Sequence, residues 1–253
     1  MKTVFYKITC LTNLHVGSGE INYNIIDNEV EKDAVSGLPV IHSSGVKGAL
    51  RDAVKDVKDF DLDYVFGKDG NGDTGNAGAY KFLDACLISR PMRVAGSNQT
   101  ASVSVVTVDS VNRLLRMLEA FGVNSFGFAS VDEPCFGDNE FLTNVAEDIM
   151  VEGEKTGKLT GTVLTQLDEL KAIIGSSFAV AKSFDGYDLP VIARNHVGKS
   201  GGLWYEEVVP HDSVLYFAVI YPDDESQAIP FPDVVQFGGN ASVGCGYCKI
   251  EKI

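Results

Sequence analysis

The sequence has few basic residues for its length. Its 253 residues include 21 lysines and arginines against 35 aspartates and glutamates, which gives a formal net charge of −14. A protein that binds nucleic acid through phosphate contacts usually carries a basic excess or a basic patch. We therefore expect either no nucleic-acid binding or basic side chains that gather on one face.

Long apolar runs and paired cysteines are also missing. No stretch approaches the roughly 20 apolar residues of a membrane-spanning helix, and residues 1–8 alternate in polarity instead of forming the apolar core of a signal peptide. The five cysteines lack the spacing of a disulfide framework. Cys245 and Cys248 form a CxxC pair, but neither a following helix nor a second ligand pair supports redox or zinc chemistry. We expect a cytoplasmic protein without membrane contact.

The apolar pattern predicts one α+β domain over residues 1–253. A hydrophobic share of 45% is ordinary for a globular protein, and nothing repeats at a fixed period. We expect a helix that begins at Asp109 as its cap and buries Val111, Leu114, Leu115, Leu118 and Phe121. The other elements follow from spacing: strands over residues 3–12, 79–88, 177–184, 202–209 and 214–221, and helices over residues 44–58 and 167–174.

The helix over residues 44–58 carries a basic stripe. Either Ser43 or Ser44 suits its N-cap, and Lys47 and Arg51 stand four residues apart, so they share one face. Two interpretations stay open: a solvated helix with internal ion pairs, or a helix whose N-terminal end and basic residues hold an RNA backbone.

Glycines recur near the end of the sequence, at positions 238, 239, 244 and 246. Glycine permits positive φ angles and close approach of a backbone or a ligand. A dinucleotide-binding loop would open a helix, whereas the residues after Gly246 are typical of a strand. We expect residues 237–246 to form a glycine-rich loop, with Gly239 and Gly244 placed where a side chain would strike RNA or need a positive φ.

These motifs together resemble those of the RAMP superfamily. The resemblance rests on residues 14–19 (LHVGSG), Asp27, residues 38–51 (LPVIHSSGVKGALR) and residues 238–246. Further segments resemble the repeated backbone subunits of Cmr (type III-B) CRISPR RNA-guided effectors: Asp84 with Ala85, residues 90–93 (RPMR), and residues 203–207 (LWYEE) with Pro210.

The resemblance implies a modified ferredoxin-like (RNA-recognition-motif) fold with an inserted β-hairpin thumb. The thumb falls on residues 184–202, and a glycine-rich loop over residues 67–79 is expected to be flexible. In that loop Asp69, Asn71 and Asp73 imitate the first ligands of a calcium loop, but the glycine and the bidentate glutamate that such a loop requires are absent.

The resemblance also implies a function. The chain would polymerise along guide CRISPR RNA, as a helical filament of its own copies with other Cmr-type subunits, and cleave complementary target RNA at regular intervals. Asp27, in a segment expected to be flexible, aligns with the loop aspartate that cuts RNA in this family, where it acts as a general base or binds a divalent cation such as Mg²⁺. No set of metal-ligating protein residues is predicted.

The same resemblance, with the basic and glycine positions above, marks a set of RNA-binding residues: His15, Ser43, Ser44, Lys47, Arg51, Arg194, His196, Gly239 and Gly244. For His15, a structural role that fixes the turn before Gly17 is the alternative. Glu206 and Glu207 resemble the acidic pair of the family, but Val208 replaces the usual aromatic residue. Strand packing or subunit contact is therefore as suitable for Glu206 as catalysis.

Two other functions remain open. The chain would be a scaffold that polymerises on guide RNA without cutting, if loss of Asp27 left activity unchanged. It would be a stand-alone endoribonuclease that processes precursor RNA through His15, if the purified monomer cleaved RNA without a guide. The net charge of −14 argues against the second of these.

Overall fold

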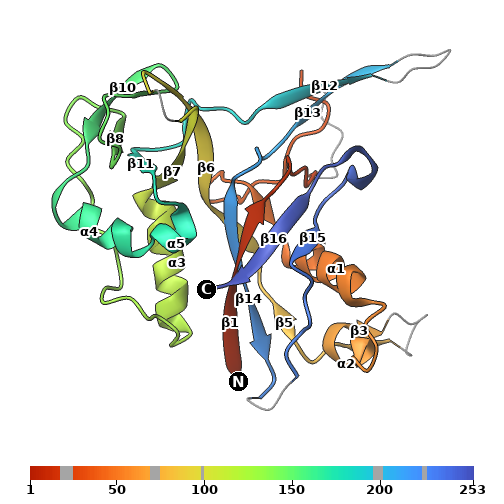
Figure 1. Cartoon of the computed structure of the whole chain (residues 1–253). Helices are drawn as coiled ribbons and strands as arrows, with labels where there is room; N and C mark the ends of the chain where they lie inside the picture. The colour runs from red at the N-terminus through yellow and green to blue at the C-terminus, as the bar shows by residue number, and fades with distance from the viewer. Residues whose placement is uncertain (18–24, 69–74, 98–99, 196–201, 224–226) are drawn as a thin grey trace. The chain divides into compact units, whose positions relative to one another are not determined.

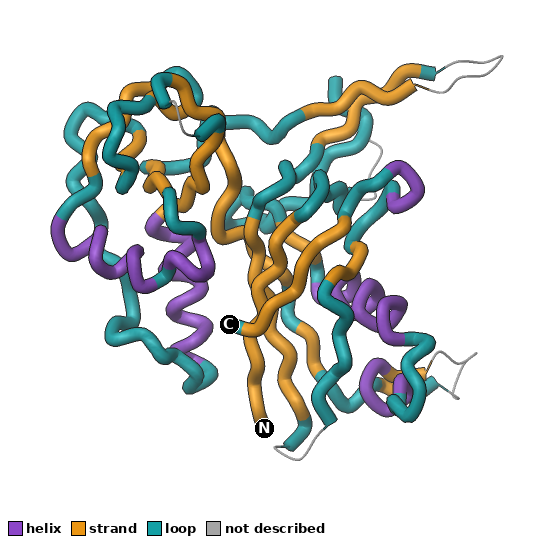
Figure 2. The backbone as a smooth tube through the Cα atoms, viewed as in Figure 1, coloured by secondary structure: helices purple, strands orange, loops and turns teal. Residues whose placement is uncertain are grey.

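The computed structural model describes the chain except for residues 18–24, 69–74, 98–99, 196–201 and 224–226. Strands and helices are mixed along the chain (Figures 1 and 2), which confirms the predicted α+β class. The contacts divide the chain into two compact units. The sheet unit consists of Met1–Cys86, Leu189–His211 and Tyr216–Ile253, and the barrel unit consists of Leu87–Asp188 and Asp212–Leu215.

Four neighbouring strands of one large sheet form the centre of the sheet unit. Their order is β15 (Val234–Gln236), β16 (Tyr247–Lys252), β1 (Lys2–Cys10) and β14 (Val214–Tyr221), whose first residues belong to the barrel unit. The alternation that predicted β1 places Ile8 in the core, fully buried. Residues 79–88, expected to be one strand, instead contain β5 (Lys81–Phe82), which pairs with β14, and the start of β6. At that start, β2 (Val40–Ile41) pairs with Ala85 and Cys86.

Two helices accompany this sheet. On the helix expected over residues 44–58, the 3.6-residue spacing predicted a buried stripe of Val46, Leu50, Ala53, Val54 and Val57. Helix α1 (Ser43–Val54) buries Val46, Leu50 and Val54 and contacts β5 and β15. It ends before residue 58, so the prediction was wrong for Val57, which is exposed. Helix α2 (Leu62–Phe66) follows it. Strands β3 (Gly67–Lys68) and β4 (Asn76–Ala77) pair within the predicted loop over residues 67–79, and the calcium-like positions lie outside the described residues.

A separate antiparallel pair, β12 (Val191–Asn195) and β13 (Leu203–Glu207), belongs to the same unit. It overlaps the hairpin expected over residues 184–202, but its second strand runs on to Glu207. Figure 1 shows this pair extending away from the sheet that contains β1 and β16.

The barrel unit is a closed ring of strands. The order is β6 (Ala85–Ala95), β7 (Ser102–Thr107), β11 (Phe178–Ala181), β8 (Phe141–Thr143), β10 (Glu154–Lys158) and β9 (Met150–Val151), and β9 pairs back onto β6. A buried cluster that includes Met92, Val105, Phe141 and Val151 fills this unit. Among the described residues, each strand of the ring pairs with two others, so closure removes the strand edges that an open sheet would have.

Helix α3 (Val108–Ala120) buries Val111, Leu114, Leu115 and Leu118, as the sequence predicted. Its cap is Thr107, not Asp109: Thr107 Oγ1 accepts the Ser110 N–H, and Ser110 Oγ accepts the Thr107 N–H. This reciprocal pair satisfies two helix-terminal donors, so Asp109 lies within the first turn. The helix expected over residues 167–174 is two helices, α4 (Gly161–Glu169) and α5 (Lys171–Ile174).

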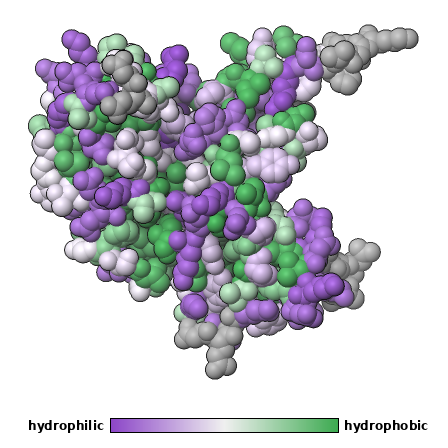
Figure 3. Space-filling model, in the orientation of Figure 1, coloured by the Kyte–Doolittle hydropathy of each residue, from purple (hydrophilic) through white to green (hydrophobic). Residues whose placement is uncertain are grey.

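None of the described helices is long and apolar enough to cross a membrane. On the face drawn in Figure 3, polar and apolar residues are interspersed.

Candidate active site

Asp27 lies in a segment that runs alongside β13 and bonds to its backbone. The backbone N–H groups of Asp27 and Asn28 both donate to the carbonyl of Tyr205, at 3.1 Å each. In return, the Tyr205 N–H donates to Asp27 Oδ2 at 2.8 Å. The side chain is exposed, and among the described residues no donor is bonded to Oδ1. The backbone therefore anchors one carboxylate oxygen and leaves the other without a donor among the described residues.

Glu207, the last residue of β13, fixes the residues that follow Asp27. Its N–H donates to the Asn28 carbonyl at 2.9 Å. Its carboxylate accepts the Val30 N–H at 3.0 Å through Oε2 and Lys32 Nζ at 2.9 Å through Oε1. The Glu207 side chain is only 5% exposed, so the charge is buried and paired, as buried carboxylates require.

His15 is buried beside the same strand. Its Nδ1 lies 2.8 Å from the Glu207 carbonyl, and because a carbonyl only accepts, Nδ1 carries the hydrogen. The His15 carbonyl accepts the Gly239 N–H at 2.9 Å. Any Cβ at Gly17 would lie 3.0 Å from His15 Nε2. These contacts support the structural interpretation of His15, which ties the glycine-rich loop to β13.

Glu206 lies beside Glu207 and binds two other segments as well as a residue of its own strand. Its carboxylate accepts from Arg194 Nε of β12, from Trp204 Nε1 at 2.8 Å and from Asn240 Nδ2 of the glycine-rich loop at 3.0 Å. Burial alone would raise the pKa of Glu206, but the hydrogen bonds from Trp204 and Arg194 outweigh it and lower this pKa below its ordinary value. The hydrogen bond to Glu206 in turn raises the pKa of Arg194.

The glycine-rich loop connects β15 to β16, and its glycines differ in what they permit. Gly238 has φ +71°, and a Cβ there would lie 2.2 Å from the His15 carbonyl oxygen. Gly246 has φ +80°, and its Cβ would lie 1.9 Å from the Phe237 carbonyl oxygen. Gly244 has φ +83° with open space around it, whereas Gly239 has no positive φ and its nearest atom is 4.0 Å away. Positions 238 and 246 therefore require glycine both for the positive φ and for the lack of room for a Cβ. Position 244 favours glycine only because of its positive φ.

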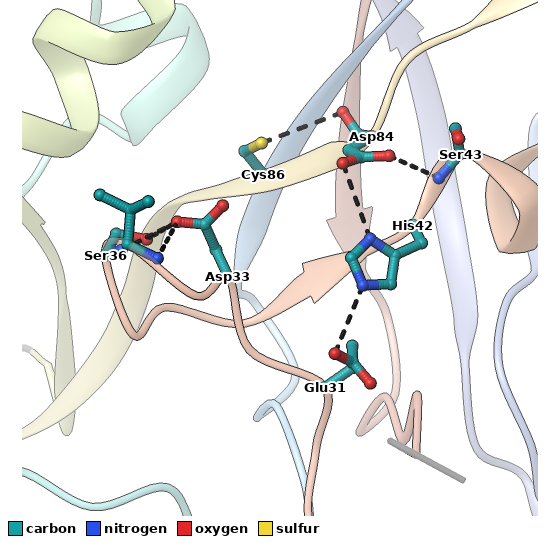
Figure 4. Close-up of polar contacts among 8 residues, drawn as sticks. Glu31, Asp33, Ser36, His42, Ser43, Asp84 and Cys86 are labelled. Atoms are coloured by element: carbon teal, nitrogen blue, oxygen red, sulfur yellow. Dashed lines mark hydrogen bonds and ion pairs between the residues drawn. The ribbon is translucent and has the colours of Figure 1, made fainter.

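The N-terminus of α1 already holds a carboxylate. His42 occupies the N-cap position without a side-chain hydrogen bond, so neither Ser43 nor Ser44 caps the helix. Instead, Asp84 Oδ1 accepts the Ser43 N–H at 2.6 Å. Figure 4 shows His42 between Asp84 and Glu31, at 3.6 and 3.3 Å. An acidic side chain at a helix N-terminus complements the helix dipole, and here it comes from a distant part of the sequence.

A family model described as the RAMP superfamily matches residues 7–249. The chain belongs to the RAMP superfamily. Over 99% of its length it is 26% identical to the CRISPR system Cmr endoribonuclease Cmr4 of Pyrococcus furiosus, of which it covers 95%.

Two solved structures share the fold of this RAMP-superfamily chain. One is a chain in the cryo-EM structure of the type III-B Cmr-beta bound to cognate target RNA, with a TM-score of 0.78 and 20% identity, covering 100% of this chain and 97% of that one. The other is the crystal structure of oligomeric Cmr4 from Pyrococcus furiosus, with a TM-score of 0.74 and 20% identity, covering 100% and 98%.

The RAMP-superfamily motifs meet around β13. The segments that carry His15, Asp27 and the glycine-rich loop all bond to this strand or to one another. Arg194 joins them through its ion pair with Glu206, so its RNA contact stays a prediction beside an observed structural role. His196 lies outside the described residues.

The basic residues of α1 form a separate group. Arg51 lies 3.8 Å from Asp63, and no ion pair joins Lys47 to a described residue. At the end of the helix, the C-cap residue Lys55 pairs with Asp52 at 2.8 Å. The internal ion pair of the solvated-helix interpretation therefore lies at the C-terminal end of α1, and Lys47 remains the better placed for a phosphate.

Sequence reasoning did not find the function of Glu207. Part of the signal was present in the sequence, because alternation in a strand places Glu206 and Glu207 on opposite faces. That both are buried is seen only in the structure. A buried carboxylate needs a partner, and for Glu207 that partner is Lys32, which no motif marks.

The described residues contain no group of three His, Cys, Asp or Glu side chains able to hold a metal ion. Asp27 contributes one carboxylate. Mg²⁺ is commonly bound through one or two carboxylates together with substrate phosphates and water. The residues therefore fit a cation shared with an RNA substrate and do not fit a cation enclosed by the protein.

Proposed function

We propose that this chain is a backbone subunit of a CRISPR ribonucleoprotein, which binds guide RNA and cleaves paired target RNA at Asp27. The observation that carries the proposal is the Asp27 carboxylate, held on Oδ2 by the Tyr205 N–H with Oδ1 left as a base. Support comes from the 26% identity, over 99% of the chain, to a protein named as a Cmr endoribonuclease.

In this mechanism Asp27 takes the proton of a 2′-hydroxyl in the target strand. The 2′-oxygen attacks the adjacent phosphorus, the bond from phosphorus to the 5′-oxygen breaks, and the leaving oxygen takes a proton from water. The products are a 2′,3′-cyclic phosphate, which hydrolyses to a 3′-phosphate, and a 5′-hydroxyl. General base catalysis contributes ~10²–10⁴-fold, so in-line positioning of the target nucleotide supplies much of the rest.

A divalent cation, Mg²⁺, is part of the proposal. When bound, it would neutralise charge on the phosphate oxygens. Asp27 would hold it together with RNA phosphates where the carboxylate acts as a cation ligand instead of as the general base.

The proposed partners are guide CRISPR RNA, complementary target RNA, other Cmr-type subunits and further copies of this chain in a helical filament, in the cytoplasm. The solved structure of an oligomeric relative supports the filament. With a net charge of −14, a single subunit repels free RNA, and many subunits on one guide strand overcome this through avidity. In this view the β12–β13 pair is the thumb, and the sheet unit is the ferredoxin-like part.

The test is a target RNA with one 2′-deoxynucleotide at the cut position. We expect the assembled complex to bind this RNA normally and to leave that position uncut, while neighbouring positions are cut and yield 5′-hydroxyl ends. Cleavage at the 2′-deoxy position, or 5′-phosphate products, would contradict the mechanism. Cleavage of RNA by the guide-free monomer would support the stand-alone endoribonuclease instead.

A further inference from the structure

The segment that carries Asp27 pairs with β13 over a very short stretch. Asn28 and Glu206 form an isolated parallel bridge, not part of a longer ladder. The backbone bonds there are those to Tyr205 and the one from the Glu207 N–H. A one-residue slip in such a pairing would turn every side chain of the segment to the opposite face, and Asp27 would then lose its position beside Tyr205.

Glu207 supplies the contacts that oppose this slip. Its two carboxylate oxygens bond to two different points of the segment, the Val30 N–H and the Lys32 ammonium group. Val30 is buried and bridges to Gly17 on its other side, so the segment is held from both directions. Lys32 is 40% exposed at its side chain, whereas Glu207 is 5% exposed. The ion pair therefore joins a solvent-exposed lysine of the segment to a buried carboxylate of β13.

We infer that Glu207 and Lys32 form a clamp that sets the register of the Asp27 segment against β13, and that both are positioning residues for cleavage. This inference rests on the proposed function. Neither residue has to touch RNA in this role. Their effect passes through the position of the Asp27 carboxylate, and a misplacement of about 1 Å costs up to ~10²-fold in rate.

The experiment uses the assembled complex with guide RNA and measures single-turnover cleavage at saturating target, together with target affinity and the melting temperature of the subunit. We expect Glu207→Gln and Lys32→Met each to slow cleavage by ~10–10²-fold, with target affinity within about twofold of wild type. Lys32→Arg keeps the charge and should retain most of the rate.

The double variant tests whether the two residues act as one unit. Glu207→Gln combined with Lys32→Met should be about as slow as the slower single variant, because residues in one contact are not additive. The matched control is Glu251→Gln, which removes a glutamate paired with Lys7 on the β1–β16 sheet and should cleave at the normal rate. If Glu207→Gln fails to fold, the cleavage rates of Lys32→Met and Lys32→Arg test the clamp, because Lys32 is exposed.

Normal cleavage by Lys32→Met and Glu207→Gln would overturn the clamp, and so would target affinity that falls in parallel with the rate. The proposed function fails separately: it is wrong if Asp27→Asn cleaves normally. If Asp27→Asn is inactive while the clamp variants cleave normally, only the clamp is wrong.

Discussion

Glu206 and Glu207 are adjacent in β13, yet their carboxylates hold two different parts of the chain. Glu206 accepts from Arg194, Trp204 and the glycine-rich loop, and Glu207 accepts from the segment that carries Asp27. Strand alternation turns the two side chains to opposite faces. One strand thereby joins the candidate catalytic segment to the loop expected to contact RNA.

Replacement of Glu206 should destabilise the protein. Glu206→Gln removes a charged acceptor from three donors, and loss of hydrogen bonds to a charged group costs about 1.5–3 kcal/mol. Urea unfolding of the isolated subunit at pH 7 measures this. Glu251→Gln removes an exposed carboxylate and should cost clearly less. An equal loss in the two variants would contradict the role given to Glu206.

The contribution of Glu206 should also depend on pH. Its pKa in the folded protein lies below its ordinary value, so the folded state favours the ionised form. The stabilisation is therefore fully present above the unfolded pKa of about 4.5 and is lost as the pH falls through the folded pKa. The difference in unfolding free energy between wild type and Glu206→Gln should shrink as the pH falls below about 4.5. If this difference instead grew below pH ~4.5, the pKa of Glu206 in the folded protein would be raised and not lowered.

The glycine-rich loop offers a matched pair of neighbours. Gly238→Ala should lose at least ~2 kcal/mol of stability, because the position has a positive φ and no room for a Cβ. Gly239→Ala should change stability by less than ~0.5 kcal/mol. If Gly239 faces RNA, Gly239→Val should weaken guide binding while the melting temperature stays unchanged. Normal guide binding by that variant would make the loop a turn without an RNA contact.

Gly244 requires its own control. Gly244→Val should lose stability because of the positive φ alone. This loss would obscure any direct effect of the substitution on guide RNA binding. Asparagine tolerates this conformation. Gly244→Asn should therefore keep the fold, and reduced guide binding by Gly244→Asn would assign an RNA contact to the position.

The basic residues on α1 and those just beyond it should differ in RNA binding. Lys47→Ala with Arg51→Ala should weaken guide binding and lower the salt slope by up to about 1.4, since two phosphate contacts are lost. Lys55→Ala with Lys58→Ala removes the same charge from the residues that follow the helix and should leave the slope unchanged. Identical slopes in the two double variants would show that α1 contributes general charge and no defined contact.

The elements that local spacing determines could be predicted from the sequence. Val46, Leu50 and Val54 of α1 and Val111, Leu114, Leu115 and Leu118 of α3 are buried where the 3.6-residue pattern placed them, and β14 has the predicted bounds. The pattern ran too far at both C-terminal ends, since Val57 and Phe121 lie beyond their helices. These features depend on residues close together in the chain.

The features that long-range contacts determine could not be predicted. Asp84 caps α1 from 41 residues away, and Glu207 bonds to Lys32 across 175 residues. The local expectation for the helix cap was a serine, and no local pattern marks Lys32 as the partner of Glu207. Gly244 has the positive φ that was one of the two alternatives predicted for it, but the surroundings of the glycines could not be predicted. The strict requirement at Gly238 comes from the His15 carbonyl, which is close in space but far away in sequence.

The central claim is that Asp27 cuts the target strand, and single-turnover cleavage by the Asp27→Asn complex tests it most directly. Asparagine keeps the shape and an oxygen for the Tyr205 N–H, so the segment should stay in place, whereas the amide cannot accept the 2′-proton as a base. We predict normal assembly and normal target binding, with cleavage slowed by at least ~10²-fold. Cleavage by Asp27→Asn at the wild-type rate would contradict the account.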